Sequence, residues 1–277
     1  MKIPYIKAHG AQNDFLLTWK DQILLPINDM AAAARVICDR HTGAGADGWL
    51  LVADAPASDL PLDAAISLWN SDGSTSEMSG NGTRCAAAML IDQERPGVLN
   101  PRIYEIGDSL RILTGAGVKQ LRLLERFGHA FFFEMNMGRA AIEDLGTTLQ
   151  GVDATILNTG NPQCAVFVEN FNFDWRNLGA TLERDPRFPN RTNVSFIRVV
   201  DEHTLEVRFF ERGAGETMSS GTGTTGAGAA AVARGLAKSP VEVLTPAGPL
   251  KLRWESDDIL LTGPAEIIAT GEFYFEE

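Results

Sequence analysis

Two short segments of the chain combine glycine with hydroxyl side chains in a pattern that could bind an anion. They are Ser79-Gly80-Asn81-Gly82-Thr83 and Ser220-Gly221-Thr222-Gly223-Thr224. Each comes just before a run of small apolar residues that predicts a helix. The unbonded N–H groups of a first helical turn point outward with the positive end of the helix dipole, which suits a carboxylate. The alternative is that each serine only caps its helix, the usual role of serine at that position.

The runs that follow predict two buried helices, over Arg84–Asp92 and Ala227–Leu236. Both are apolar almost all round, and a helix without a polar face is a buried helix. A third helix is predicted over Asp29–Cys38, with Asn28 or Asp29 as the N-cap.

Short β-rich runs fill most of the remaining chain, separated by Gly, Asn, Asp and Pro. This predicts antiparallel sheet rather than repeated βαβ units. The runs are Phe15–Trp19, Trp49–Val52, Ala65–Trp69, Gln120–Leu124, Ala130–Met135, Ala165–Val168, Val194–Val200, Leu205–Phe210, Val241–Leu244, Leu250–Trp254 and Ile259–Leu261. Together with the short apolar helices, they predict an α+β fold in which each sheet wraps around a central helix.

The chain also repeats itself. Besides the two serine–glycine segments, three further pairs occur in the same order: Trp69-Asn70 with Phe210-Glu211, Glu77-Met78 with Thr217-Met218, and the stretch 114–122 with 245–253. Such internal similarity predicts a duplicated unit. We therefore expect two pseudo-symmetric lobes: an N-terminal lobe over 1–122, completed by a strand over 263–277, and a C-terminal lobe over 123–262. Two equivalent loops in two equivalent lobes favour one small anionic ligand held in a shared site.

Composition excludes several other classes of protein. The 277 residues carry 24 Lys+Arg against 36 Asp+Glu, and the net charge of −12 makes nucleic acid an unexpected partner. No apolar run is long enough to span a bilayer, and the N-terminus lacks a secretory pattern, so no membrane partner is expected. The three cysteines, Cys38, Cys85 and Cys164, are widely spaced and odd in number, which indicates the reducing cytoplasm and neither a disulfide framework nor a metal site.

Two G-x-G-x-x-G matches, at 43–48 and 221–226, are not expected to bind a dinucleotide. That fold needs the motif between a strand and a helix, with an acidic residue at the end of the next strand. A strand follows the first match, and the strand after the second ends in Thr245.

Several blocks along the chain carry a resemblance to one family. They are Gly10-Ala-Gln-Asn13-Asp14-Phe15, Asp39-Arg-His-Thr-Gly43-Ala-Gly45-Ala-Asp47-Gly48, Asn70-Ser-Asp-Gly73-Ser, Met78-Ser-Gly80-Asn81-Gly82-Thr-Arg84-Cys85, Gly160-Asn161-Pro162, Pro189-Asn-Arg-Thr-Asn193-Val194, and Glu211-Arg212-Gly-Ala-Gly215-Glu216-Thr217 running into Ser220-Gly221-Thr222-Gly223. Over essentially its whole length the chain resembles diaminopimelate epimerase, a cofactor-independent amino-acid epimerase.

The resemblance implies a fold and an activity. The fold is two similar lobes, each a curved, mostly antiparallel sheet around a central apolar helix, commonly in a homodimer. The activity is an isomerase reaction that interconverts LL- and meso-2,6-diaminopimelate in lysine biosynthesis. Two cysteines exchange a proton at the α-carbon without pyridoxal phosphate, metal or any other cofactor.

The resemblance also implies the site residues. The acid/base positions fall on Ser79 and Ser220, with Gln163 and Glu211 at the assisting positions. The substrate-binding positions are Asn13, Asn70, Gly80, Asn81, Asn161, Asn193, Arg212, Gly221 and Thr222. Considered without the resemblance, Asn70 and Asn193 could be ordinary turn residues, and Arg212 could form an exposed ion pair with Glu211.

The chain departs from the family at three of the four catalytic positions. Ser79 and Ser220 stand where the family has cysteines, and Gln163 stands where it has a histidine. A serine hydroxyl is far less acidic than a thiol and needs an adjacent base, and a glutamine side chain takes up no proton at neutral pH. We therefore expect epimerisation by this sequence to be very slow or absent.

Three explanations remain open. The serines can be engineered replacements that trap a substrate complex or prevent oxidation of the site. They can be natural in a divergent paralogue that binds an amino acid without turning it over. Finally, the chain can run a one-sided isomerisation or dehydration that uses Glu211 alone.

Overall fold

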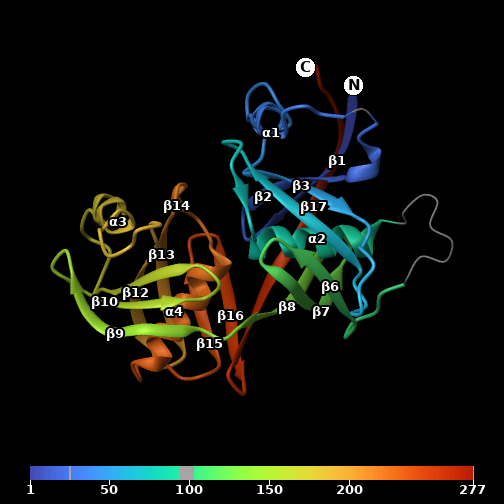
Figure 1. The fold of residues 1–277 in the computed structure, drawn as a ribbon. Helices are drawn as coiled ribbons and strands as arrows, with labels where there is room; N and C mark the ends of the chain where they lie inside the picture. Colours follow the sequence, from blue (N-terminus) through green and yellow to red (C-terminus); the bar gives the residue numbers. More distant parts are fainter. Residues whose placement is uncertain (25, 94–102, 277) are drawn as a thin grey trace. The chain divides into compact units, whose positions relative to one another are not determined.

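The computed structural model describes residues 1–24, 26–93 and 103–276, which fold into two compact units (Figure 1). Unit 1 comprises Met1–Met135 with Pro264–Glu277, and unit 2 comprises Asn136–Gly263. The two units divide after Met135, whereas the sequence predicted a lobe boundary after residue 122. The reason is the hairpin of β7 (Gly117–Phe127) and β8 (Ala130–Gly138), which pairs with β6 (Ser109–Thr114) and so stays with unit 1.

Unit 1 is built on a closed cycle of paired strands. In pairing order these are β1 (Lys2–Gly10), β2 (Asn13–Trp19), β3 (Gly48–Ala53), β4 (Ala64–Asn70), β6, β7, β8 and β17 (Asp258–Tyr274), and β17 pairs with β1 again. The pairs β2–β3 and β4–β6 are parallel. A two-residue strand, β5 (Thr75–Ser76), adds to β4.

Unit 2 has a similar succession of paired strands. Its strands pair in the order β9 (Ala141–Leu149), β10 (Val152–Asn158), β11 (Pro162–Phe167), β12 (Asn193–Asp201), β13 (Thr204–Glu211), β15 (Val241–Thr245), β16 (Gly248–Glu255) and β17, with β14 (Gly215–Thr217) added to β13. The parallel pairs β11–β12 and β13–β15 follow the antiparallel pairs β10–β11 and β12–β13, just as β2–β3 and β4–β6 follow β1–β2 and β3–β4 in unit 1. The predicted α+β fold with two similar lobes and mostly antiparallel sheet is confirmed.

Each unit encloses one central helix, α2 (Gly80–Asp92) in unit 1 and α4 (Gly221–Ala233) in unit 2 (Figure 1). Both are buried along nearly their whole length, as the apolar runs predicted. They begin four and six residues before those runs, because the glycine-rich segments are already helical. Small residues let strands approach closely: a Cβ at Gly228 would lie 2.3 Å from Leu252 Cδ1.

A shorter helix packs on the outside of each unit. The helix α1 (Met30–Cys38) begins as predicted after Asp29, whose Oδ1 accepts the Ala32 N–H at 2.9 Å. Its counterpart α3 (Trp175–Glu183) was not predicted. Gly179 lowers helix propensity there, yet it allows contact with the ring of Phe210, which a Cβ would approach to 2.8 Å.

All the predicted β-rich runs overlap strands, whereas β1, β5, β6, β9, β10 and β14 were missed. In the described part of the chain, no helix is both long and apolar enough to cross a membrane.

Candidate functional site

In unit 2, Ser220 and Glu211 form a hydrogen-bonded pair at the start of α4. Ser220 is the N-cap: its Oγ accepts the Gly223 N–H at 3.1 Å. The same hydroxyl donates to Glu211 Oε2 at 2.8 Å, and Thr217 Oγ1 donates to Glu211 Oε1 at 2.7 Å. Ser220 is 3% exposed. The serine therefore caps the helix and at the same time donates a hydrogen bond to a carboxylate, so capping does not exclude a second role for Ser220.

The local fold explains how these groups meet. Strand β13 ends at Glu211, the chain turns through Gly213 in the left-handed region (φ 79°), and β14 returns antiparallel with Glu211 opposite Gly215. That tight hairpin places Thr217 and then Ser220 beside the carboxylate at the end of β13.

On another side of α4, Gln163 and Asn161 form a chain of amides that reaches Thr222. Gln163 Nε2 donates to Asn161 Oδ1 at 2.6 Å, and Asn161 Nδ2 donates to Thr222 Oγ1 at 3.3 Å. Gln163 is 1% exposed, and its Oε1 finds no donor among the described residues. A buried amide oxygen without a donor is costly, so this position holds an unused acceptor beside the first turns of α4.

Asn193 ties two parts of the predicted site together. Its Oδ1 accepts the Arg212 N–H at 3.0 Å, and its Nδ2 donates to the Pro162 carbonyl at 3.2 Å. The Arg212 side chain is exposed, and its Nη1 donates to the Asn190 carbonyl at 3.2 Å. The amide of Asn193 thereby links the backbone of Arg212 to that of Pro162.

In unit 1, Ser79 occupies the place that Ser220 has in unit 2. It caps α2 by accepting the Gly82 N–H at 3.1 Å. Among the described residues, no acceptor lies within hydrogen-bonding reach of its hydroxyl proton. The residue that corresponds to Glu211 is Asn70 at the end of β4, and its Nδ2 donates to Ser74 Oγ at 3.0 Å. The two serines share a fold position but not a chemical environment.

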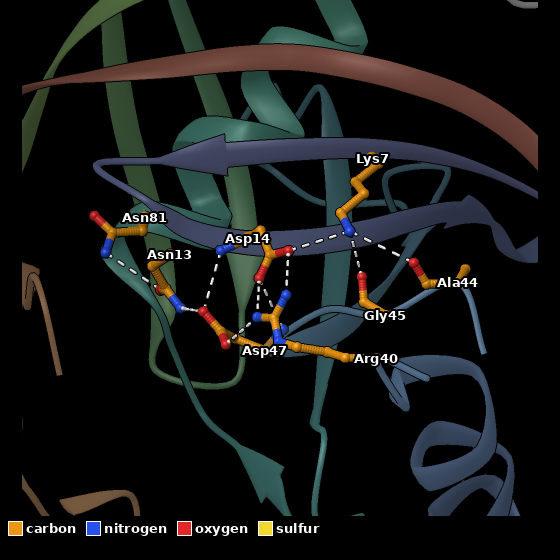
Figure 2. A network of polar contacts seen from close by, with 8 residues as sticks. All are labelled: Lys7, Asn13, Asp14, Arg40, Ala44, Gly45, Asp47 and Asn81. Carbon is orange, nitrogen blue, oxygen red and sulfur yellow. Dashed lines mark hydrogen bonds and ion pairs between the residues drawn. The ribbon is translucent and has the colours of Figure 1, made fainter. Parts of the chain in front are cut away.

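Asn13 and Asn81 lie together at the first turn of α2 (Figure 2). Asn81 Nδ2 donates to Asn13 Oδ1 at 3.2 Å, and Asn13 Nδ2 donates to Asp47 Oδ2 at 2.7 Å. Gly10 allows this approach, because a Cβ there would lie 3.1 Å from the Asn81 backbone. Gly80 and Gly221 are the first residues of α2 and α4, where backbone N–H groups have no acceptor within the helix.

Through Asp47, Asn13 is connected to a network of charged side chains (Figure 2). The Arg40 guanidinium contacts Asp14 Oδ1 at 2.6 Å and Asp47 Oδ1 at 2.7 Å, and Lys7 Nζ lies 3.3 Å from Asp14 Oδ2. Burial alone would raise the pKa of Asp14, but Arg40 and Lys7 outweigh it and lower the pKa below its ordinary value. The resembling blocks contain Asp14, Arg40 and Asp47 but not Lys7, and no role was predicted for any of the four, because the partners come from separate segments.

Arg84 is another residue whose role the sequence did not indicate. It is fully buried in α2, donates from Nε to the Pro264 carbonyl at 3.0 Å, and donates from Nη2 to Asn81 Oδ1. Burial lowers its pKa to about 10. Asn81 is thus oriented on its oxygen by Arg84 and on its nitrogen by Asn13.

The chain is similar in sequence to known proteins. The sequence profile of the family Diaminopimelate epimerase matches residues 5–142 and 155–268. Diaminopimelate epimerase of Pelotomaculum thermopropionicum is 33% identical, over 97% of this chain and 98% of its own length. That of Nostoc punctiforme is 35% identical, over 98% of this chain and all of its own length.

The chain belongs to the diaminopimelate epimerase family. Its fold is shared more widely. A hydroxyproline epimerase from Agrobacterium vitis, solved with bound trans-4-hydroxy-L-proline, matches with a TM-score of 0.72 at 14% identity, over 98% of this chain and 90% of its own. A methylitaconate-delta-isomerase matches with a TM-score of 0.68 at 14% identity, over 98% and 95%.

The three cysteines of this family member are buried and free. Burial raises the thiol pKa of Cys38, Cys85 and Cys164 to about 12, so each stays protonated at neutral pH. Within the described residues, no three His, Cys, Asp or Glu side chains gather in a way that could hold a metal ion.

Proposed function

We propose that this chain is a diaminopimelate-epimerase-type protein that binds 2,6-diaminopimelate and moves protons at its α-carbon, between the LL and meso forms. The observation that carries the proposal is the Ser220–Glu211 hydrogen bond at the N-terminus of α4, within a chain that matches the family end to end. The reaction needs no pyridoxal phosphate, and its place is lysine biosynthesis. By family resemblance we also propose a homodimer.

The helix termini supply the electrostatic part of this chemistry. The backbone N–H groups of Gly80, Asn81, Gly221 and Thr222 would bind the α-carboxylate. Removal of the α-proton spreads negative charge into that carboxylate, and fixed N–H dipoles stabilise the developing charge. Asn13, Asn70, Asn161, Asn193 and Arg212 would bind the distal amino-acid end.

The side chains at the acid/base positions limit the rate. Ser220 has a carboxylate to receive its proton, whereas Ser79 has none among the described residues and Gln163 cannot replace an assisting histidine. Each missing acid–base group costs about 10²–10⁴ in rate. Interconversion by this sequence is therefore very slow. The second candidate, favoured by the environment of Ser79, is a protein that binds the same ligand without epimerising it.

Titration calorimetry tests the ligand. We expect LL- and meso-diaminopimelate to bind, and lysine, which lacks the second carboxylate, to bind at least about tenfold more weakly because a charged hydrogen bond is lost. Equal affinity for lysine, or no heat with any of the three, would contradict the proposal.

A pair of arginine variants locates the distal contact. Arg212→Gln should weaken binding of diaminopimelate by about tenfold or more. Arg176→Gln is the matched control: Arg176 pairs with Glu216 on the surface, so its loss should leave the affinity within about twofold. Equal weakening by both changes would remove Arg212 from the binding site.

A further inference from the structure

The two serine clusters are equivalent in fold and unequal in chemistry. Both serines cap a central helix in the same way: each hydroxyl oxygen accepts the backbone N–H of the residue three positions later, at 3.1 Å. Only Ser220 continues into a carboxylate, 2.8 Å away on Glu211. The corresponding residue in unit 1, Asn70, is an amide whose nitrogen is engaged with Ser74.

This difference decides which cluster can remove a proton. When Ser220 Oγ takes the proton of a C–H bond, its own hydroxyl proton has an acceptor already in place. A carboxylate can both take up and release protons at neutral pH. An amide does neither. Thr217 holds the other oxygen of Glu211, so the oxygen facing Ser220 is oriented toward the hydroxyl.

We propose that this chain catalyses exchange of the α-hydrogen of diaminopimelate with solvent, at one configuration only and with retention of that configuration. The inference rests on the proposed function, since it takes the same ligand at the same site. It adds an activity, namely hydrogen exchange uncoupled from inversion.

The step balances without an added reactant. The α-carbon–hydrogen bond breaks, its electron pair moves into the adjacent carboxylate, and the proton passes to Ser220 Oγ as the hydroxyl proton passes to Glu211 Oε2. Before the reverse step, the Ser220 hydroxyl and the protonated Glu211 exchange hydrogens with each other and with water, so that Ser220 Oγ carries a solvent-derived hydrogen. The reverse step returns a solvent-derived hydrogen to the same face of the same carbon, and nothing is oxidised or reduced.

Inversion would need a second group that delivers a proton. The only hydroxyl at the corresponding position is Ser79, which lacks a relay within the described structure. The absence of one positioned acid–base group makes inversion slower than exchange by about 10²-fold or more.

The test uses the full chain in deuterated water, with proton NMR for the loss of α-hydrogen and chiral chromatography for the stereoisomers. We expect deuterium at α-carbons of one configuration in LL- or meso-diaminopimelate, with no new stereoisomer on the same timescale. Deuterium that appears together with the inverted isomer would overturn the inference and leave the proposed epimerase intact. No deuterium, despite binding by calorimetry, would overturn the inference alone; no binding would overturn the proposed function.

Variants of two neighbouring acids identify the base. Glu211→Gln keeps the size of the side chain and removes the base, so exchange should fall by 10²-fold or more. Glu216→Gln makes the same chemical change in an exposed side chain that pairs with Arg176, and exchange should stay within about twofold. Glu211→Asp guards against misfolding: it should retain more exchange than Glu211→Gln at equal stability. Equal rates for Glu211→Gln and the unmodified chain would overturn the assignment.

Discussion

At the scale of single residues, the proposed chemistry depends on serine at the two positions where the family resemblance implies cysteine. A thiol at a helix N-terminus readily becomes a thiolate, while a serine there depends on a neighbouring base. Ser220 has such a base in Glu211. The hydroxyl of Ser79 is hydrogen-bonded only to the N–H of Gly82 among the described residues. The cysteines that the chain does have cannot compensate, because burial keeps them protonated.

Thiol labelling checks this account of sulfur. At pH 8 the folded chain should react with no more than a trace of a thiol reagent, since Cys38, Cys85 and Cys164 are buried with pKa near 12. In denaturant all three should react. A Ser79→Cys variant should gain one fast-reacting thiol in the folded state, because a half-buried cysteine at a helix N-terminus has a lowered pKa. Rapid labelling of the unmodified folded chain would contradict it.

At the scale of elements, the N-termini of α2 and α4 are stabilised to different degrees. Ser79 makes one cap bond, whereas Ser220 makes the cap bond and a buried bond to a carboxylate. Loss of a cap costs about 1 kcal/mol, and loss of a hydrogen bond to a charged group costs about 1.5–3 kcal/mol.

Urea unfolding of two alanine variants measures that difference. Ser79→Ala should lower the free energy of unfolding by about 1 kcal/mol. Ser220→Ala should lower it by about 2–4 kcal/mol, because the Glu211 carboxylate also loses its partner. If the two variants lose the same stability, Ser220 does not donate to Glu211 in solution.

The network behind Asn13 gives unit 1 a defined pH dependence. Arg40 and Lys7 hold the pKa of Asp14 below its ordinary value, so Asp14 stabilises the folded chain above about pH 4 and loses this contribution as the pH falls through its folded pKa. Asp14→Asn should therefore unfold at lower denaturant than the unmodified chain at pH 7, with the gap closing below about pH 4. A gap that stays constant from pH 7 to pH 3 would argue against an ionised Asp14 in the folded state.

At the scale of the whole molecule, one design occurs twice along the chain. Strands β1 to β8 with α1 and α2 correspond to the second set with α3 and α4, and β8 and β17 each carry the chain from one unit into the other. Because the copies have diverged at Asn70 and Glu211, the duplicated fold carries an unequal pair of sites.

Sequence reasoning found the parts of this design that have a local signal. The apolar runs predicted the central helices α2 and α4, and Asp29 predicted the start of α1 as an N-cap. The helix α3 was not predicted because Gly179 lowers its helix propensity. Glycine is required there by the close contact with Phe210, which lies on a strand later in the chain. The Asp14–Arg40–Asp47 network and the hydrogen bond from Arg84 to Pro264 also join distant segments. No spacing in the sequence could therefore predict them.

The most direct test of the central claim introduces the residues that the family resemblance implies at three positions together, in Ser79→Cys/Ser220→Cys/Gln163→His, and measures conversion of LL- to meso-diaminopimelate by chiral chromatography. The account predicts a rate at least 10²-fold above that of the unmodified chain, because each change returns a group that can take or give a proton. A variant that folds and binds diaminopimelate yet forms no meso isomer above the unmodified chain would contradict it.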